Sequence, residues 1–270
     1  MYLIYNGTPC PLDDFRISFN NRGFQYGDGI FETMIAENNA VNYLTDHLDR
    51  LKNAMTAFSL ESNENFNETL SSQIYHLLKI NNQSEARIKI IVWRTGEGLF
   101  VPDDNDTDYI ITSIPLKRPP ALKNSVDFFQ DARLGKHPLS PYKTLNCLPY
   151  VLAGLEKKKT GMDDLVLLSH EGYVAECISS NIFFEKDGAI FTPSIETGCK
   201  EGIMKKQIKK ICAKEGIRFE EVLWKQEELF DADLIFTGNV ATLSLITNVA
   251  HKSFLSSSPL YSLIKESLEN

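Results

Sequence analysis

A proline-rich stretch near the middle of the chain most constrains how it can fold. Residues 114–121 read Ile-Pro-Leu-Lys-Arg-Pro-Pro-Ala, and proline lacks the backbone N–H that helices and central strands need. Such a stretch, with charges beside the prolines, is typical of an extended connector. The chain has 270 residues, which is enough for one large or two medium domains. We therefore expect an α+β domain at residues 1–115, a linker at 116–124 and a larger domain at 125–270.

The N-terminal part alternates between strand and helix patterns. Apolar segments that fit strands are Met1–Tyr5, Gly29–Ala36, Ala86–Trp93 and Tyr109–Pro115. A helix is expected after Thr45, a suitable N-cap residue, because apolar residues from Leu48 to Phe58 recur at helical spacing. A second helix is expected from about Asn65 to Leu78.

The C-terminal part contains more strands, and they are shorter. Helices are expected at Asn146–Thr160, from Gly202 to about Glu215, and near Tyr261–Leu268. Strands are expected at Leu165–Leu168, Tyr173–Cys177, Asn181–Glu185, Ala189–Thr192, Leu234–Thr237 and Ala241–Thr247. Asp187-Gly188 predicts a tight hairpin turn. This order predicts the α+β class with much antiparallel sheet, and it lacks the βαβ rhythm of a doubly wound fold.

Composition and charge disfavour several classes of protein. The net charge of -8 argues against a general nucleic-acid binder, which usually carries a basic patch. No apolar run approaches the length of a membrane span, and the N-terminus lacks the pattern of a signal peptide. The five cysteines are scattered and form no Cys-x-x-Cys pair, which fits neither a disulfide framework nor a zinc site. We expect a reduced, cytoplasmic protein without a metal site, a membrane partner or a nucleic-acid partner.

Two charged residues stand out because their surroundings are neutral. Lys143 is the one charged residue within 139–155, and Glu176 is the one charged residue within 173–184. Burial of a lysine favours the neutral amine, a nucleophile that can form a Schiff base with an aldehyde. A carboxylate can keep a pyridine nitrogen protonated, so that the ring withdraws electrons. The pair points to pyridoxal phosphate chemistry, although each residue alone also fits a surface lysine or an exposed glutamate on an edge strand.

Several motifs, taken in order, resemble the class-IV pyridoxal-phosphate aminotransferases of fold type IV. They run from residues 21–33, Asn-Arg-Gly-Phe-Gln-Tyr-Gly-Asp-Gly-Ile-Phe-Glu-Thr, to residues 237–239, Thr-Gly-Asn. The family includes branched-chain and D-amino-acid transaminases and 4-amino-4-deoxychorismate lyase. The resemblance implies a smaller N-terminal domain, a larger C-terminal domain with a mostly antiparallel, barrel-like sheet, the cofactor pyridoxal 5'-phosphate between them, and a homodimer.

The resemblance also assigns roles to individual residues. Lys143 would form the Schiff base and then act as the base at the substrate's α-carbon. Glu176, in a Val-x-Glu-x-x-x-x-Asn-Ile-Phe pattern, would keep the pyridine nitrogen protonated. Arg50, in a His-x-x-Arg-Leu pattern, would bind the phosphate through its guanidinium fork. Without the resemblance, a solvated helix face explains Arg50 equally well, and His47 fits a structural role.

Two loops would complete the phosphate site. The helix expected at Gly202 offers free N–H groups and a positive dipole end, and the resemblance assigns the backbone amides of Ile203 and Met204. Asn239 and the backbone amide of Val240 follow an expected strand and match the remaining phosphate contact of the family. Each feature alone also fits an ordinary loop.

The substrate side is less sharply specified. The resemblance places Tyr26 and Thr33 beside the substrate pocket, and Arg94 is a candidate for binding a substrate carboxylate. A surface arginine at a strand end is the alternative for Arg94. The run Lys-Thr-Leu-Asn at 143–146 is closer to the lyase and D-amino-acid branches than to branched-chain members, which commonly show Gly-Gly-Asn-Tyr. One observation argues against the lyase. Aminodeoxychorismate carries carboxylates that call for cationic partners, but no second arginine follows shortly after Arg94.

We therefore expect an enzyme that acts through Lys143 on a small amine or amino acid. The sequence leans towards a 4-amino-4-deoxychorismate lyase-like elimination of pyruvate, with D-amino-acid or branched-chain transamination as the alternative. An idle relative that only binds the cofactor is disfavoured by the presence of both Lys143 and Glu176. An acid hydrolase lacks support, because Asp163-Asp164 and Glu220-Glu221 fit solvated turn and strand-end charges.

Overall fold

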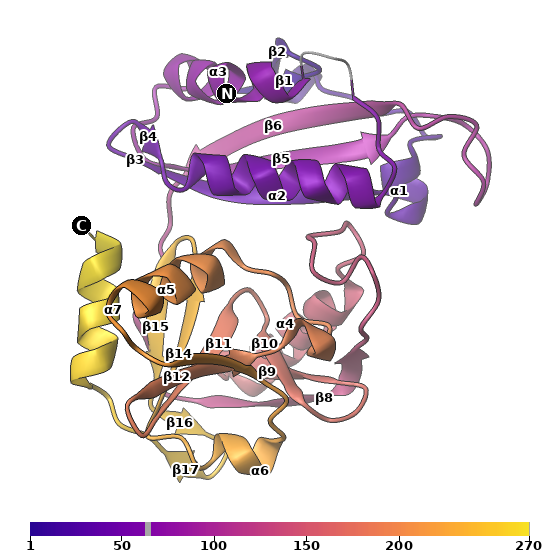
Figure 1. The fold of residues 1–270 in the computed structure, drawn as a ribbon. Coiled ribbons are helices and arrows are strands. Elements are labelled where there is room, and N and C mark those ends of the chain that lie inside the picture. Colours follow the sequence, from indigo (N-terminus) through magenta and orange to yellow (C-terminus); the bar gives the residue numbers. More distant parts are fainter. Residues whose placement is uncertain (63–65, 270) are drawn as a thin grey trace. The chain divides into compact units, whose positions relative to one another are not determined.

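The computed structural model describes residues 1–62 and 66–269. The chain divides into two compact units, unit 1 with Met1–Lys117 and Tyr142–Asn146, and unit 2 with Arg118–Pro141 and Cys147–Asn270 (Figure 1). The division after Lys117 lies within the proline-rich stretch. The segment Tyr142–Asn146, which carries the candidate residue Lys143, returns to unit 1, and no sequence pattern indicated this.

Unit 1 is built on an antiparallel sheet with the strand order β2-β1-β6-β5-β3-β4. Its strands are β1 (Tyr2–Tyr5), β2 (Thr8–Pro11), β3 (Gly29–Glu37), β4 (Ala40–Val41), β5 (Ala86–Arg94) and β6 (Thr107–Pro115). The expected strands are all present, and the short strands β2 and β4 extend the sheet at its edges. Ile88, Ile90 and Val92 of β5 are buried at every second position, as a half-buried strand requires.

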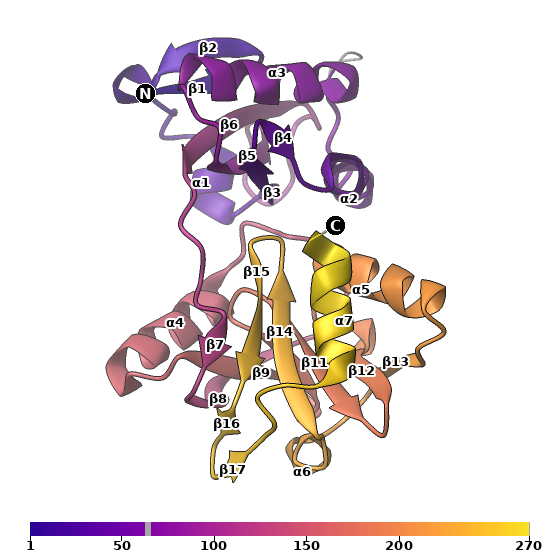
Figure 2. The same cartoon turned by 90° about the vertical axis from the view of Figure 1, so that its left-hand side faces the viewer.

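Within the described residues, two long helices pack on this sheet. They are α2 (Leu44–Ala57), beside β3, and α3 (Phe66–Ile80), beside β1 and β6 (Figure 2). Apolar residues of both helices, Leu51 and Leu77 among them, share one core with Ile88. The expected cap at Thr45 is wrong, because α2 begins at Leu44 after Tyr43, whose side chain makes no capping hydrogen bond. The expected start of the second helix at Asn65 lies outside the described residues.

Unit 2 contains two sheets, with the strand orders β10-β9-β8-β16-β17 and β13-β12-β11-β14-β15-β7. The first holds β8 (Val126–Leu134), β9 (Asp164–Ser169), β10 (Val174–Cys177), β16 (Asn248–Val249) and β17 (Lys252–Ser253). The second holds β7 (Leu122–Lys123), β11 (Asn181–Lys186), β12 (Ala189–Pro193), β13 (Phe219–Val222), β14 (Leu234–Asn239) and β15 (Thr242–Ile246). Both sheets combine antiparallel pairs with parallel pairs, such as β8 with β9, so the sheets are mixed.

Apolar side chains from both sheets meet in one core. Phe128 and Val166 come from the first sheet, and Ile182 and Ile235 come from the second. The predicted turn at Asp187-Gly188 joins β11 to β12, and both residues have positive φ values, +49° and +72°, as a type I' hairpin turn requires.

Four helices complete unit 2: α4 (Leu148–Thr160), α5 (Ile203–Lys214), α6 (Gln226–Leu229) and α7 (Pro259–Glu269). Helix α4 packs on β8 and β9, whereas α5 packs on β14 and α7 (Figure 2). Helix α4 begins two residues later than expected, with Pro149 in its first turn, where the missing N–H is tolerated. The predicted α+β class is confirmed.

The expected linker at 116–124 is not a free connector along its whole length. Its last part forms β7, which pairs in parallel with β15 of unit 2. There the Nζ of Lys123 donates to Oδ2 of Asp164 at 2.6 Å and to Oγ1 of Thr237 at 2.8 Å. Asp164 was expected to be a solvated turn charge, but it is buried, because this ammonium compensates its charge. The ion pair joins the two sheets, since Lys123 and Thr237 belong to one and Asp164 to the other.

Replacing Lys123 with methionine should destabilise unit 2. The change leaves the carboxylate of Asp164 buried without its cation, which typically costs roughly 3–5 kcal/mol. Urea unfolding followed by tryptophan fluorescence should show a lower midpoint for Lys123→Met. Lys117→Met, at an exposed lysine, is the control and should keep the wild-type midpoint. Equal midpoints for both variants would contradict this role of the ion pair.

Candidate functional site

Lys143 lies in a segment that runs along the first residues of β3. The N–H of Phe31 donates to the carbonyl of Lys143 at 2.8 Å, and the N–H of Leu145 donates to the carbonyl of Gly29 at 3.0 Å. A Cβ atom at Gly29 would lie 2.9 Å from Cδ1 of Leu145 and 2.5 Å from a carbonyl of β5. Glycine at this position therefore allows the segment to approach the strand closely.

The side chain of Lys143 lies over an aromatic ring of the same unit. Its Nζ is 5.3 Å from the ring centroid of Phe31, within the range of a cation–π contact. The sequence predicted a buried lysine, but Lys143 is partly exposed. The apolar residues that follow it do not enclose it, since Leu148 is itself 73% exposed.

A second ammonium group lies over the same ring. The Nζ of Lys89, in β5, is 4.6 Å from the centroid of Phe31, and Lys89 is paired with Thr33 across the β3–β5 ladder. Residues two apart on a strand share a face, so Phe31 and Thr33 point the same way. The predicted pocket residue Thr33 thus belongs to one cluster with Phe31, Lys89 and Lys143. Sequence reasoning missed Lys89, because a lysine in an alternating strand usually marks the solvent face.

Arg50 is held in place by a buried carboxylate. Its Nε donates to Oε1 of Glu32 at 2.6 Å and one terminal nitrogen donates to Oε2 at 2.8 Å, while Nδ1 of His47 contacts Oε2 at 2.9 Å. Burial alone raises the pKa of Glu32, but the charge of Arg50 and the hydrogen bonds from both partners lower it from 4.5 to about 2. The bidentate pair fixes the guanidinium of Arg50, and His47 has the structural role expected for it.

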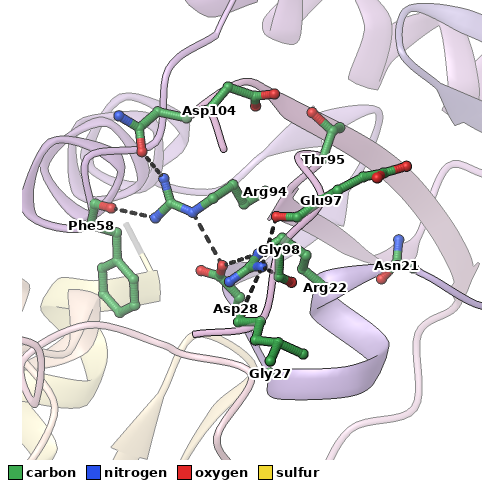
Figure 3. Close-up of polar contacts among 12 residues, drawn as sticks. Asn21, Arg22, Gly27, Asp28, Phe58, Arg94, Thr95, Glu97, Gly98 and Asp104 are labelled. Atoms are coloured by element: carbon green, nitrogen blue, oxygen red, sulfur yellow. Dashed lines mark hydrogen bonds and ion pairs between the residues drawn. The ribbon is translucent and has the colours of Figure 1, made fainter. Parts of the chain in front are cut away.

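Arg94 is enclosed by acceptors of unit 1 (Figure 3). Its Nε donates to Oδ2 of Asp28 at 3.1 Å. Its terminal nitrogens donate to the carbonyls of Phe58 and Ser59 and to the side chain of Asn105. Arg94 is 7% exposed. These contacts engage most of the N–H donors of its guanidinium, so the geometry favours a structural role over recognition of a substrate carboxylate.

Asp28 also binds Arg22, which organises the neighbouring loop. The Nε of Arg22 donates to Oδ2 of Asp28 at 2.8 Å, and its Nη1 donates to the carbonyls of Glu97, Gly98 and Leu99 (Figure 3). Arg22 belongs to α1 (Arg22–Tyr26), a short helix that the sequence analysis did not expect. The predicted pocket residue Tyr26 ends this helix, and its ring lies 5.8 Å from that of Phe100 in the loop.

In unit 2, Glu176 is buried on β10 and is 3% exposed. Two donors from different elements bind its carboxylate. The hydroxyl of Tyr150, in α4, donates to Oε1 at 2.6 Å, and the backbone N–H of Lys200 donates to Oε2 at 3.1 Å. Although β10 is an edge strand, Glu176 is therefore not a solvated residue of that edge.

The peptide at Lys200 is held from both sides. Its N–H donates to Glu176, and its carbonyl accepts a hydrogen bond from Nδ2 of Asn181 at 3.0 Å. A Cβ atom at Gly202 would lie 1.8 Å from Oδ1 of Asn181, so this position requires glycine. The Glu-x-x-x-x-Asn spacing noted in the sequence thus brings both side chains to the loop that leads into α5.

The predicted phosphate elements of unit 2 lie side by side. Helix α5 begins at Ile203 after Gly202, whose position provides no side-chain cap, so its first N–H groups are available to a ligand. A Cβ atom at Gly238 would lie 2.9 Å from Cγ of Met204, which shows how closely the end of β14 approaches this helix.

The side chain of Asn239 already has partners in the turn after β14. Its Oδ1 accepts from the N–H groups of Ala241 and Thr242, and its Nδ2 donates to the carbonyl of Ser179. It therefore shapes the turn that carries the backbone amide of Val240.

Converting Glu32 to glutamine should weaken folding in a pH-dependent way. The folded pKa of about 2 lies below the ordinary 4.5, so Glu32 stabilises the fold above pH 4.5, and this contribution is lost as the pH falls towards 2. At pH 7, Glu32→Gln should lose about 3 kcal/mol of unfolding free energy, measured by urea unfolding.

The pH dependence provides the check on this assignment. Between pH 4.5 and 2 the wild type should lose stability more steeply than Glu32→Gln. Glu85→Gln, at an exposed glutamate, should behave as the wild type throughout. Parallel curves for the wild type and Glu32→Gln would show that Glu32 is not the group responsible.

Comparison with known proteins places these clusters in context. The family model described as amino-transferase class IV matches residues 29–250. A protein of Methanocaldococcus jannaschii named "Putative branched-chain-amino-acid aminotransferase" is 29% identical over 248 residues, which cover 90% of this chain and 86% of that protein.

Solved structures agree on the fold. The structure of the branched-chain amino acid aminotransferase of Escherichia coli matches with a TM-score of 0.91 at 22% identity, covering 99% of this chain and 93% of that one. A Legionella pneumophila protein described as "Putative 4-amino-4-deoxychorismate lyase" matches with a TM-score of 0.87 at 20% identity, covering 95% of this chain and 96% of that one.

Two further observations bear on the kind of site. In the described part of the chain, no helix combines the length and apolarity needed to cross a membrane. Within residues 1–62 and 66–269, no group of three or more His, Cys, Asp or Glu side chains is arranged to hold a metal ion.

The family match spans well over half of the chain, and this protein belongs to the class-IV aminotransferases.

Proposed function

We propose that this chain is an amino-acid transaminase in which Lys143 forms the Schiff base with pyridoxal 5'-phosphate. Class-IV aminotransferases use this cofactor, and when bound it withdraws electrons from the substrate's α-carbon. The observation that supports the assignment most directly is the fixed segment at Lys143. Its backbone is bonded to β3 on both sides of Thr144, which fixes the point from which the lysine side chain extends, and positioning of this kind supports a catalytic base.

The residues of each unit fit the cofactor. In unit 2, helix α5 starts without a side-chain cap, and the glycines at 202 and 238 let the side chains of Asn181 and Met204 approach the backbone closely. There the backbone amides of Ile203, Met204 and Val240 would hold the phosphate, and the turn shaped by Asn239 would carry the last of these amides. The family resemblance also assigns the phosphate to Arg50 of unit 1, whose guanidinium is held by Glu32.

Glu176 and Lys143 would divide the remaining work. The carboxylate of Glu176 would accept a hydrogen bond from the protonated pyridine nitrogen. The amine of Lys143 would act as the base that takes the proton from the α-carbon of the substrate. Phe31 and the predicted pocket residues Tyr26 and Thr33 would exclude water from the site.

Two arginines of unit 1 favour transamination over the lyase reaction that the sequence preferred. Aminodeoxychorismate carries carboxylates that need cationic partners. Arg22 and Arg94 are both engaged by Asp28 and by backbone carbonyls, so neither guanidinium is presented to such a substrate. The names of the curated relatives, branched-chain-amino-acid aminotransferases, point in the same direction.

Lys89 supports a simple α-amino acid as the substrate class. Its ammonium and that of Lys143 lie over one ring. An amino acid whose amine reacts at Lys143 would find in Lys89 a cation for its carboxylate. We propose this in place of the role that the sequence analysis gave to Arg94.

The lyase remains the second candidate because of one specific feature. The run Lys-Thr-Leu-Asn at 143–146 is closer to the lyase and D-amino-acid branches, and the Legionella protein shares the fold. Both reactions need the same lysine and acid, so the decision depends on what is assayed after the cofactor is bound.

We also propose that the protein is cytoplasmic and forms a homodimer. Exposed apolar residues recur along one side of α4, with Leu148, Val151, Leu152 and Leu155 each at least 47% exposed. Such a stripe marks a surface for protein association, and a second copy of this chain is the occupant that the family resemblance favours.

Lys143→Ala should abolish the visible absorption band that forms with pyridoxal phosphate, because the Schiff base requires the amine. Lys158→Ala, at an exposed lysine of α4, is the matched control and should keep the band. With the wild type, an amino acid should convert the bound cofactor to the pyridoxamine form, and a 2-oxo acid should reverse the change. Release of pyruvate from aminodeoxychorismate without an acceptor would instead establish the lyase.

Arg94→Lys separates the structural role of this arginine from substrate recognition. Lysine keeps the charge but loses the fork that holds Asp28 and the carbonyls. We expect the unfolding free energy to fall by about 2 kcal/mol, with the KM for the amino acid unchanged. Lys89→Met should show the opposite pattern. Its unfolding free energy should be unchanged, and its KM for the amino acid should rise at least about 10-fold, as for loss of one charged contact. A large rise in KM for Arg94→Lys at unchanged stability would restore the sequence-based assignment.

A further inference from the structure

The donors that bind Glu176 form a small network within unit 2. Tyr150 reaches the carboxylate from α4, and Lys200 reaches it from the loop before α5. The ammonium of Lys200 also lies 5.3 Å from the ring centroid of Tyr150 and donates to the carbonyl of Ser140 at 3.0 Å. Glu176, Tyr150 and Lys200 therefore hold one another through side-chain and backbone contacts, although they come from three separate segments of the chain.

The hydroxyl of Tyr150 can act towards Glu176 only as a donor. Burial raises the pKa of Tyr150, and the negative charge of Glu176 raises it further, so the phenol keeps its proton at every pH at which the protein is used. At 2.6 Å the contact has the length of a hydrogen bond to an ionised acceptor. Each oxygen of a carboxylate can accept more than one hydrogen bond, so Glu176 keeps acceptor capacity for a ligand.

Tyr150 faces the interior on a helix whose other large apolar side chains face outward. It packs with Ala153 in a cluster that includes Phe129 and Leu165, whereas Leu148 and Val151 are exposed. The sequence did not single it out, because an aromatic residue in an apolar helix pattern is ordinarily a core residue. The hydroxyl of Tyr150, which binds Glu176, distinguishes it from an ordinary core residue.

We propose that Tyr150 is a positioning residue that holds the carboxylate of Glu176 in the orientation required to bind the pyridine nitrogen of the cofactor. This inference rests on the proposed function of Glu176. Tyr150 fixes one oxygen and the Lys200 peptide fixes the other, so the plane of the carboxylate is set before the cofactor binds. Since the Lys200 peptide also leads into α5, the same network ties the acid to the loop assigned to the phosphate.

A double-mutant cycle on cofactor affinity tests this assignment. Tyr150→Phe keeps the ring over Lys200 and removes the hydroxyl alone. It should weaken pyridoxal phosphate binding about 10-fold, as expected for loss of one hydrogen bond to a charged group, and should alter the visible circular dichroism of the bound cofactor. In a Glu176→Ala background the same change should have less than about a 2-fold effect, because the residue through which Tyr150 acts is gone.

Tyr173→Phe is the control for loss of a tyrosine hydroxyl in unit 2. The ring of Tyr173 also lies near a lysine, with Nζ of Lys225 5.7 Å from the ring centroid. The Tyr173→Phe variant should bind the cofactor with the affinity of the wild type. Urea unfolding of each variant verifies that it is folded, so that cofactor affinities are compared between folded proteins.

The outcomes separate this inference from the function on which it rests. A wild type without a Lys143-dependent band would overturn the proposed function and this inference together. A normal wild-type band with equal losses for Tyr150→Phe in both backgrounds, or with no loss in either, would overturn the role of Tyr150 alone.

Discussion

The pairing of residues 142–146 with β3 is the constraint on which the proposed chemistry depends. These residues leave unit 2 after Pro141, bond to Gly29 and Phe31 of unit 1, and return at Cys147. Glycine at 29 makes the approach possible, and the two backbone hydrogen bonds fix the segment. A lysine on a free loop would sample many positions, whereas one on a strand-like segment keeps a defined one.

Several carboxylates hold other elements of the structure in place in the same way. The buried Glu32, Asp164 and Glu176 and the partly buried Asp28 each accept hydrogen bonds from donors that come from another element. A buried charge is costly unless it is compensated, so each carboxylate holds its partners in place. Glu32 fixes the guanidinium of Arg50, Asp28 closes the loop after β5, Asp164 joins two sheets, and Glu176 connects α4 to the start of α5.

Much of the fold could be predicted from local patterns, because the long strands and helices have strong apolar periodicity. Strand β8 was missed, since Asp127 and Asp131 interrupt its apolar residues, and β7 was read as part of a linker because it has only two residues. Positions near Lys143, Glu176 and the start of α5 were recognised through motifs. The partners Lys89 and Tyr150 were not, and Asn181 was noted only as part of the motif around Glu176, because contacts between residues far apart in sequence leave no local pattern.

Arg94 shows why residue type alone cannot assign a role. An arginine at a strand end beside a glycine-rich loop fits carboxylate recognition and loop closure equally well, and only the acceptors around it distinguish the two. The most direct test of the central claim is borohydride reduction of the protein with pyridoxal phosphate, followed by mass spectrometry of its peptides. The account predicts a phosphopyridoxyl group on Lys143. Attachment to Lys89 or another lysine, or no stoichiometric attachment, would contradict it.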